Sequence, residues 1–397
     1  GMFIWTGFDY RGEPTPYGWP SVTSYFGMMD LCGFPKDNAW YLKSWWGTEP
    51  ILHLFPHWNW GGQEGKIINV WVYSNCDEVE LFLNNKSLGR KKMDTNGHLE
   101  WAVAYSPGTL EAIAYKDGKK LMRDVVQTTG DPVAIRLTPH KKQLSADGED
   151  VSIITVDALD NKGLPVPTAG NEITFSLHGP GKIIGVGNGD PTSLEKDKFL
   201  ETIQTFNIEN LKEKELSSID DKKEATAVID DANWKEAFKD RDYKKLPKAY
   251  VYRGSFMLPE NISTSVVTFF YKNIGREQSI FVNGKNIATN LKEDETANGF
   301  VLDPAILKTG QNVISILATP IPKKYEWDNV NTDPGLIQVV SPAEPWRRKL
   351  FSGKAQLIVQ STSDPGVITI TASSAKLKSS VLTLEVKKVD SRMSMSE

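Results

Sequence analysis

The chain has 397 residues, a length that predicts about two to four domains, each large enough to bury a core of its own. Charge is nearly balanced, with 46 basic and 50 acidic residues, and no basic cluster is interleaved with aromatics, so we expect no nucleic-acid partner. No apolar run reaches the roughly 18 residues that a membrane-spanning helix needs, so we expect no membrane partner either.

The cysteines and histidines show no metal-binding pattern. Cys32 and Cys76 fall in different predicted domains, so a disulfide between them is not expected. His53 and His57 have helical spacing, but Pro56 between them argues against a shared metal on a helix. We therefore expect no metal site and no cofactor in this chain, while a divalent or sodium ion bound outside it stays open.

The opening stretch FIWTGFDYRGEP joins an apolar run ending at Trp5 to a group of polar residues. This pattern predicts a buried strand that delivers Trp5, Asp9 and Arg11 to the rim of a site. Because an indole stacks on the apolar face of a sugar while charged groups bind its hydroxyls, the stretch is typical of a carbohydrate site. The alternatives are that Trp5 belongs to a core, that Asp9 and Arg11 form a mutual salt bridge, and that Glu13 is a structural or rim residue.

Further along, residues 38–46 have the spacing of a short amphipathic helix, and alternating apolar residues then predict a small β-sandwich. Its expected strands are residues 66–73, 78–83, 98–103 and 109–115. Residues 84–89 are expected to form a hairpin turn, and residues 116–119 the last turn. We expect the alternating apolar positions to form its core.

A second sandwich is predicted from residue 133 onward. Its expected strands before residue 195 are 133–139, 151–158 and 172–177. The stretch GVGNGDP at residues 185–191 predicts a tight loop, since no strand–helix context supports a dinucleotide site. The strands that this sandwich lacks appear near the C-terminus, at residues 353–361, 366–373 and 381–386. We therefore predict an insertion in a surface loop, where closing a longer loop costs little.

The insert has a strand pattern of its own after a charged run at residues 209–216, which predicts a solvated linker or a short helix. Its expected strands are residues 249–256, 266–271, 278–285 and 312–317, and Asn283-Gly284 predicts a type I′ turn. Its loops offer side chains that could contact carbohydrate, namely Trp234, Tyr243, Arg253, Trp327 and Asp328. The alternative is that Trp234 and Tyr243 pack the end of the sandwich.

Residues 3–37, including PYGWPSVTSYFG and DLCGFPKD, closely resemble the end of the catalytic (β/α)8 barrel in glycoside hydrolase family 2, the β-galactosidase family. The resemblance implies that this segment closes one wall of the sugar pocket, with Trp5 at the stacking position. In the family the two catalytic glutamates lie on earlier barrel strands, so no catalytic residue is implied in this chain. The helix at residues 38–46 would then lack the strands it covers, and we expect it to be poorly ordered or to dock on a neighbouring domain or a second molecule.

Later motifs resemble the accessory domains of the same family. VWVYSNCDEVELFLNNKSLG resembles its immunoglobulin-like module, GVGNGDP resembles a loop of its invasin-like module, and YRGSFMLPE, IFVNGKNIA and LKTGQNVISILA resemble a galactose-binding-like jelly roll. The expected fold is therefore mostly β, with tandem immunoglobulin-like β-sandwiches and an inserted jelly roll, preceded by a barrel remnant. The predicted domains are the barrel end at residues 1–48, the immunoglobulin-like sandwich at 49–129, the invasin-like sandwich at 130–195 and 346–390, and the jelly roll at 196–345.

The function that the resemblance implies is that of a C-terminal fragment of a β-galactosidase-like retaining glycoside hydrolase. Such a fragment supplies a pocket wall and bracing β domains, lacks the catalytic glutamate pair and is inactive alone. The alternatives are a carbohydrate-binding module that acts through the insert, and a structural scaffold. The implied partner of the intact enzyme is a β-galactoside or a plant polysaccharide; a homo-oligomer stays open, and a periplasmic or secreted location is expected for the parent enzyme.

Overall fold

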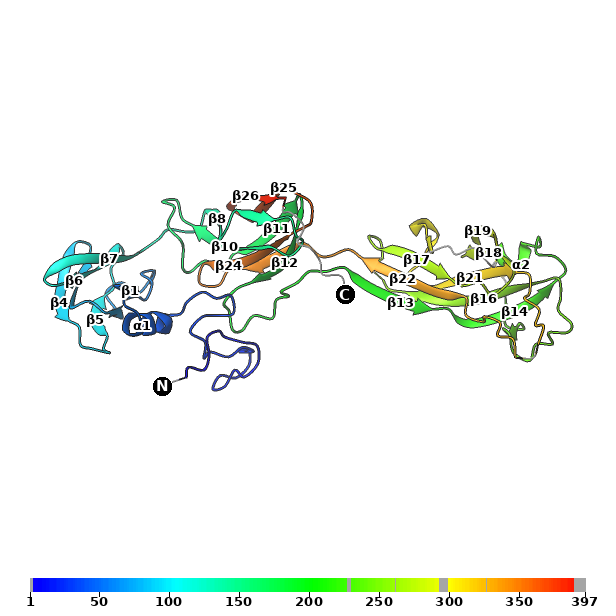
Figure 1. Ribbon diagram of the computed structural model, residues 1–397, viewed down its shortest axis with the longest axis horizontal. Coiled ribbons are helices and arrows are strands. Elements are labelled where there is room, and N and C mark those ends of the chain that lie inside the picture. The colour runs from blue at the N-terminus through cyan, green and yellow to red at the C-terminus, as the bar shows by residue number, and fades with distance from the viewer. Residues whose placement is uncertain (1–2, 227–229, 261, 293–298, 326, 389–397) are drawn as a thin grey trace. The chain divides into compact units, whose positions relative to one another are not determined.

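The computed structural model describes residues 3–226, 230–260, 262–292, 299–325 and 327–388 (Figure 1). Contacts divide the chain into two compact units, Gly1–Phe199 with Pro345–Glu397, and Leu200–Glu344. Both are built mainly from antiparallel β-strands, so the expected fold class, mostly β with sandwich domains, is confirmed. Of the predicted domains, residues 1, 2, 227–229, 261, 293–298, 326, 389 and 390 lie outside the described residues.

Residues 3–36, called the N-terminal segment below, run as an irregular chain held by isolated bridges such as Phe8 with Met29 and Arg11 with Thr23. The buried strand expected at its start is not observed, because Phe3 is fully exposed and Trp5 is 73% exposed. An extended stretch can bury its backbone groups only beside neighbouring strands, and the described residues place none there. The prediction of a buried strand that ends at Trp5 is therefore wrong for the described chain.

Helix α1 (Asp37–Trp46) follows the N-terminal segment and packs on the first sandwich. The hydroxyl of Tyr41 donates to the carbonyl of Asn96 at 2.7 Å. The indole N–H of Trp45 donates to the carbonyl of Gly97 at 3.2 Å. Of the two outcomes expected for this helix, docking on a neighbouring domain is the one observed.

The first sandwich consists of two sheets, drawn in blue and cyan in Figure 1, with the strand orders β1-β2-β5 and β4-β3-β6-β7. The strands are β1 (Leu52–Phe55), β2 (Ile67–Ser74), β3 (Glu78–Leu83), β4 (Lys86–Lys92), β5 (Leu99–Ala104), β6 (Thr109–Lys116) and β7 (Lys119–Gln127). Between the sheets, Trp58, Leu81 and Leu110 are fully buried. Alternation in β3, β5 and β6 places the expected apolar residues in this core.

The hairpin turns of this sandwich are shorter than expected. Asn84 and Asn85 alone connect β3 to β4, with φ of 50° and 63°, the left-handed conformation that both positions of a type I′ turn require. The turn expected at 84–89 is therefore wrong beyond this pair, because the chain from Lys86 onward belongs to β4. The turn expected at 116–119 likewise has two residues, and the strand β7 follows it.

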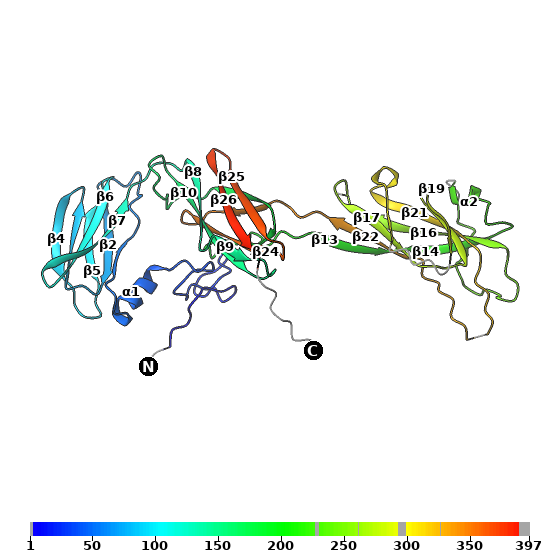
Figure 2. The same cartoon turned by 45° about the horizontal axis from the view of Figure 1, so that its top comes forward.

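The second sandwich combines strands from both sides of the insert (Figure 2). Its main path has the order β12-β24-β10-β8-β26-β25-β11-β23, and β9 pairs with β26. The strands are β8 (Ala134–Pro139), β9 (Gln143–Ser145), β10 (Val151–Leu159), β11 (Glu172–His178), β12 (Gly181–Gly187), β23 (Trp346–Lys349), β24 (Lys354–Ser361), β25 (Gly366–Ser374) and β26 (Leu377–Lys387). Because β24 pairs with both β10 and β12, the C-terminal strands complete the sheet that the earlier strands begin.

The unit Leu200–Glu344 has two sheets, with the orders β13-β22-β17-β20 and β15-β14-β16-β21-β18-β19. Its elements are β13 (Thr202–Asn207), β14 (Glu209–Leu216), α2 (Lys223–Thr226), β15 (Lys235–Glu236), β16 (Ala249–Leu258), β17 (Val266–Tyr271), β18 (Glu277–Val282), β19 (Lys285–Lys292), β20 (Phe300–Val301), η1 (Pro304–Ile306), β21 (Gly310–Ala318) and β22 (Gly335–Ser341). Tyr252, Phe256 and Phe269 are buried between the sheets. Asn283 and Gly284, with φ of 47° and 79°, form the expected type I′ turn between β18 and β19.

The charged run at residues 209–216 is a strand, so the expected linker or short helix is wrong. Strand β14 pairs with β16 on one side and with β15 on the other. Its carboxylate Glu213 is 7% exposed and forms an ion pair with Arg241. A strand normally shows alternating apolar and polar residues, and the inward-facing Glu213 interrupts that alternation. Arg241, which neutralises the charge of Glu213, lies in a later loop.

Candidate functional site

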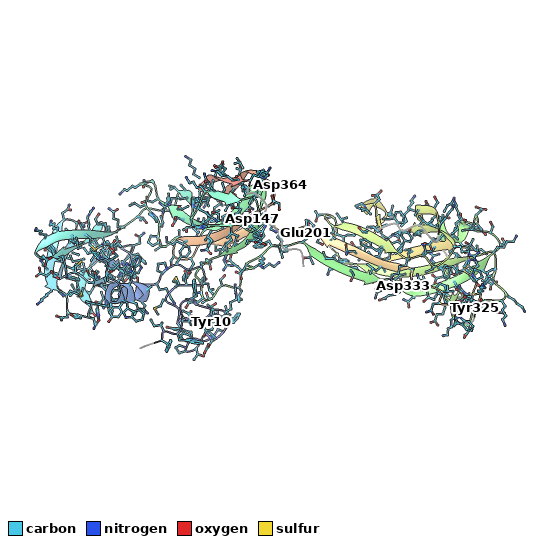
Figure 3. The ribbon with its side chains drawn as sticks, viewed as in Figure 1. Tyr10, Asp147, Glu201, Tyr325, Asp333 and Asp364 are labelled. Atoms are coloured by element: carbon cyan, nitrogen blue, oxygen red, sulfur yellow. The ribbon has the colours of Figure 1, made fainter. Side chains whose placement is uncertain are left out.

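Trp5 lies on the surface of the N-terminal segment, 73% exposed. Its indole N–H donates to the hydroxyl of Tyr10 at 3.1 Å, and the two rings meet edge to face. The Tyr10 hydroxyl, labelled in Figure 3, donates in turn to the carboxylate of Glu13, and this hydrogen bond raises the pKa of Tyr10. The indole is therefore held by its edge, and Glu13 takes a structural role.

Other large aromatic side chains of the same segment are also exposed, namely Phe3, Phe8, Tyr17 and Trp19. Exposed aromatics concentrated in one short segment mark a surface that another part of a protein or a ligand covers. Sequence reasoning did not single out Tyr17 and Trp19, although the motif PYGWP carried the signal. Two aromatic rings flanked by prolines and a glycine cannot bury themselves in regular structure.

Asp9 is buried within the N-terminal segment, 8% exposed. Its Oδ1 accepts from the backbone N–H of Gly27 at 2.8 Å, and both carboxylate oxygens accept from Lys36 Nζ at 2.9 Å. A buried carboxylate requires such partners, because desolvation of an unpaired charge is costly. Asp9 therefore ties together three parts of the segment that are far apart along the chain.

Arg11 reaches outward from the same segment and forms an ion pair with Asp197 of the second sandwich. The mutual salt bridge considered for Asp9 and Arg11 is therefore wrong, since each side chain has a different partner. These partners are 27 and 186 residues away along the chain, respectively, so no local pattern could have indicated them.

Two of the five candidates in the insert, Arg253 and Trp234, lie around Asp231. Arg253 is buried on β16, with its Nε 3.4 Å from Oδ2 of Asp231. The backbone N–H of Trp234 donates to the carbonyl of Asp231 at 3.0 Å. The Trp234 ring packs, partly buried, against a cluster that includes Leu216 and Phe281.

Of the other three candidates, Trp327 and Asp328 lie in the long loop between β21 and β22, and Tyr243 lies beside Lys323 of that loop. Lys323 Nζ sits 4.5 Å from the centre of the Tyr243 ring. Trp327 is 79% exposed and stacks in parallel on Tyr325, which Figure 3 labels, with the ring centres 5.0 Å apart. Asp328 shapes this loop by accepting the backbone N–H of Tyr325 at 2.9 Å. The five candidates thus fall into two groups, of which the second carries the exposed aromatic surface.

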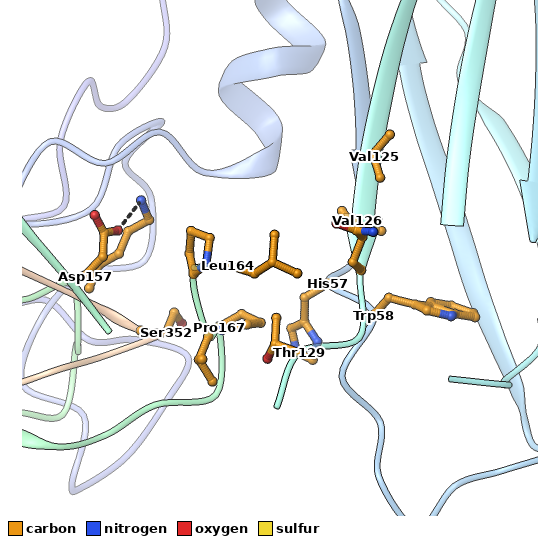
Figure 4. A pocket seen from close by; sticks show the side chains of 14 residues that line it. His57, Trp58, Val125, Val126, Thr129, Asp157, Leu164, Pro167 and Ser352 are labelled. Atoms are coloured by element: carbon orange, nitrogen blue, oxygen red, sulfur yellow. Dashed lines mark hydrogen bonds and ion pairs between the residues drawn. The ribbon is translucent and has the colours of Figure 1, made fainter. Parts of the chain in front are cut away.

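A cavity of about 250 Å³ lies between the two sandwiches of the first unit (Figure 4). His57 lines it, accepting the backbone N–H of Asn59 on Nδ1 at 3.1 Å, and burial lowers the pKa of His57. Asp157 is the one carboxylate among the lining residues, and it is already paired with Arg136 and Lys354. The cavity therefore offers no pair of carboxylates for glycoside hydrolysis.

Within the described part of the chain, no group of three or more His, Cys, Asp or Glu side chains could hold a metal ion. Cys32 and Cys76 are free thiols. None of the described helices has the length and apolar character needed to span a bilayer.

Fold and surface together define a protein of linked β-sandwich modules with an exposed tryptophan whose indole N–H is hydrogen-bonded. Comparison with known protein families agrees. Residues 135–207 match the glycoside hydrolase family 2 C-terminal domain 5, and residues 65–122 match a domain of unknown function (DUF4982).

Curated relatives point to the same family. The chain is 50% identical over 200 residues to the β-galactosidase BoGH2A of Bacteroides ovatus, a match that covers 50% of this chain and 23% of the relative. It is 31% identical over 184 residues to a β-glucuronidase of Formosa agariphila, covering 45% of this chain and 19% of the relative. The chain thus spans about a quarter or less of the length of these relatives.

Among solved structures, the crystal structure of a β-glycosidase from Bacteroides vulgatus matches 96% of this chain and 30% of its own, with a TM-score of 0.56 and 24% identity. At that identity the match supports the fold alone. The relationship expected from the sequence is confirmed by the matching domain and the curated relatives: this chain is related to the C-terminal region of glycoside hydrolase family 2 enzymes.

Proposed function

We propose that this chain is the accessory C-terminal region of a retaining family 2 glycoside hydrolase, in which the N-terminal segment forms one wall of the sugar pocket. The observation that carries the proposal is the exposed Trp5, whose indole N–H is bound to Tyr10. An aromatic ring already held in one orientation stacks on a sugar with little further loss of side-chain freedom.

The three candidates of the N-terminal segment have different proposed roles. Trp5 contacts the sugar directly. Asp9 and Arg11 influence sugar binding indirectly, by holding the N-terminal segment in place. The carboxylate of Asp9 is bound to Lys36, and the guanidinium of Arg11 is bound to Asp197. Both side chains therefore fix the wall on which Trp5 is carried.

The chemistry itself requires two carboxyl groups about 5 to 5.5 Å apart, one as acid/base and one as nucleophile. We propose that these glutamates come from a catalytic barrel outside this chain, so that the chain alone is inactive. The substrate class is a β-galactoside or a β-glucuronide, because relatives of both names match this chain. A β-galactoside, free or within a plant polysaccharide, is favoured by the higher identity to the relative named a β-galactosidase.

The first test is hydrolysis of chromogenic β-galactosides and β-glucuronides. The purified chain should give no turnover, and robust hydrolysis would refute the placement of the carboxylates. In the natural polypeptide that carries this chain, Trp5→Ala should raise KM about fivefold with a smaller change in kcat, because the lost stacking energy is of order 1 kcal/mol. Trp46→Ala, at another exposed tryptophan, should leave KM unchanged.

A second proposed function is polysaccharide binding by the insert. The exposed, stacked pair of Trp327 and Tyr325 favours it, because a broad aromatic surface on a long loop suits a sugar chain. Binding to immobilised plant polysaccharides should fall several-fold in Trp327→Ala and persist in Trp234→Phe, which keeps a packed ring. Equal binding by both variants and the wild type would place any glycan contact elsewhere.

A further inference from the structure

The glycine-rich stretch after β12 packs against the N-terminal segment. A Cβ atom built on Gly187 would lie 2.7 Å from Sγ of Cys32, and one built on Gly189 would overlap the carboxylate of Asp30. Neither glycine adopts a positive φ, so the backbone conformation does not require glycine at either position. The absence of side chains at Gly187 and Gly189 instead provides the space in which Asp30 and Cys32 lie.

Hydrogen bonds hold the two surfaces together on either side of these glycines. Gln356 Nε2 of β24 donates to the carbonyl of Cys32 at 2.7 Å. The backbone N–H of Val22 donates to the carbonyl of Pro191 at 3.0 Å. These hydrogen bonds fix which residues of the N-terminal segment lie against the glycines, in addition to the close packing.

Arg348 on β23 organises the second sandwich at this place. Its side chain is 1% exposed, and its Nη2 donates to Oδ1 of Asn188, between the two glycines, at 3.0 Å. Its Nη1 donates to Oδ1 of Asp197 at 3.2 Å, while Oδ2 of Asp197 binds Arg11. Because a guanidinium offers several donors in one rigid plane, Arg348 fixes both partners at once.

We propose that Gly187, Asn188, Gly189, Asp197 and Arg348 form a seat that positions the N-terminal segment. In this role Arg348 and Asp197 are positioning residues for the sugar-stacking Trp5. The consequence for the sugar rests on the proposed function of the segment, whereas the seat itself does not.

A short path of contacts leads from the seat to Trp5. Val22, bound to Pro191 of the second sandwich, accepts the backbone N–H of Gly12 at 2.8 Å. The carbonyl of Tyr10 accepts the backbone N–H of Ser24 at 2.8 Å, and the Tyr10 hydroxyl holds the indole of Trp5. A change in the seat that shifts the N-terminal segment would therefore also shift the ring of Trp5.

Cys32 provides a direct probe of the seated state. Burial raises the pKa of its thiol to about 12, so at pH 8 a much smaller fraction of it is ionised than of a free thiol, whose pKa is about 8.5. Iodoacetamide reacts with the thiolate, and release of the segment should therefore accelerate alkylation of Cys32. Cys76, 3% exposed in the first sandwich, is the internal reference for global unfolding.

The decisive comparison uses two substitutions on the same strand. Gly187→Ala should raise the alkylation rate of Cys32 at least tenfold and leave that of Cys76 unchanged. Gly185→Ala is the matched control, because a Cβ there has its nearest neighbour at 3.8 Å, an ordinary contact. A Cys32 rate in Gly187→Ala equal to that of the control would overturn the proposal.

A compensating variant guards against a simple folding defect. Sγ of Cys32 is the one atom within 4 Å of the Cβ that Gly187→Ala would add, so Cys32→Ala removes the clash. Hydrogen exchange of residues 9–36 should rise in Gly187→Ala and return to within about twofold of wild type in the double variant. Failure of Cys32→Ala to restore protection would show that the packing at Gly187 is not what seats the segment.

Asp197→Asn tests the ion pairs of Asp197 with Arg11 and Arg348. The substitution does not change the core, since Asp197 is about half exposed. It should raise Cys32 alkylation several-fold, and Arg348→Lys should do the same because an ammonium cannot hold Asn188 and Asp197 together. In the natural polypeptide, Asp197→Asn should raise KM more than it lowers kcat. Faster alkylation with unchanged KM would retain the seat and refute the pocket-wall function, whereas unchanged alkylation would refute the seat.

Discussion

Removal of the Arg241 charge should destabilise the insert strongly. The side chains of Arg241 and Glu213 are 3% and 8% exposed. The guanidinium donates to Glu213 and, at 3.0 Å, to the hydroxyl of Tyr252, and its centre lies 4.2 Å from that of the Tyr250 ring. In Arg241→Met the stem keeps its apolar contacts, but Glu213 retains only the backbone N–H of Phe238 as a partner.

The magnitude follows from the burial of the pair. Breaking a buried ion pair by removing one partner costs about 3–5 kcal/mol, because the remaining charge is desolvated without compensation. For a unit of this size, about 3–4 °C of Tm corresponds to 1 kcal/mol, so we expect the Tm of the insert to fall by about 10–20 °C. The pair joins β14 to the loop that carries Trp234 and Tyr243, so that loop should also become a protease target.

Two control variants separate charge burial from loss of packing. Glu213→Leu combined with Arg241→Met removes both charges, and its free energy of unfolding should lie within about 1 kcal/mol of wild type. Lys239→Met removes one partner of an exposed pair with Glu236 and should leave Tm unchanged.

Thermal and urea unfolding followed by circular dichroism, with limited trypsin digestion, provides the assay. A loss below 1 kcal/mol in Arg241→Met, with the loop still resistant to trypsin, would refute the reasoning. A double variant as unstable as the single one would refute it as well, because the cost would then come from packing and not from the unpaired carboxylate.

Three further changes give sharp expectations. For Asp160, burial raises the pKa but three backbone N–H donors lower it further, so the pKa falls below its usual value. Ionised Asp160 therefore stabilises the fold, and this contribution is complete above the unfolded-state pKa of about 4. The contribution is lost as the pH falls through the lower folded-state pKa. In urea titrations, the difference in free energy of unfolding between wild type and Asp160→Asn should therefore close below pH 4. Asn283→Ala should cost about 2–3 kcal/mol, because alanine tolerates the φ of 47° poorly and the side-chain bond to Val313 N is lost; an unchanged urea midpoint would contradict this. Trp45→Ala should abolish the hydrogen-exchange protection of α1 and leave that of β2 unchanged, because Trp45 holds the helix on the sandwich. Loss of protection in both α1 and β2 would contradict this and would show that the helix unfolds together with the sandwich core.

The sequence predicted best those strands whose inner face is wholly apolar. In β16 and β17 the alternating or continuous apolar residues lie where expected, because their neighbours on both sides are also strands. β4 was missed because KSLGRKK is exposed along most of its length and pairs with β3 on one side only. Such an edge strand owes its conformation to its neighbour and not to its own sequence.

The candidate site was predictable to a similar extent. Trp5 was singled out by its position at the end of an apolar run; the structure leaves its ring exposed, and its contact with sugar stays a prediction. The binding of Asp9 by Lys36 was not predictable, because ion pairs between residues far apart along the chain leave no local pattern. The same holds for Arg348, which resembles any surface arginine in sequence but is buried among partners from the other side of the insert.

The position of Arg348 also explains how the second sandwich tolerates its insertion. The chain leaves the sandwich after Glu195 and Asp197 and returns at β23, and Arg348 binds both departing residues from the returning strand. The carboxylate of Glu195 also accepts the backbone N–H of Lys349 at 3.1 Å. Because the two ends of the insertion are already joined on the sandwich, its length adds little to the entropy of closing the loop. The same arginine holds the seat of the N-terminal segment, so a mutation that loosens the insertion point should also loosen the wall that carries Trp5.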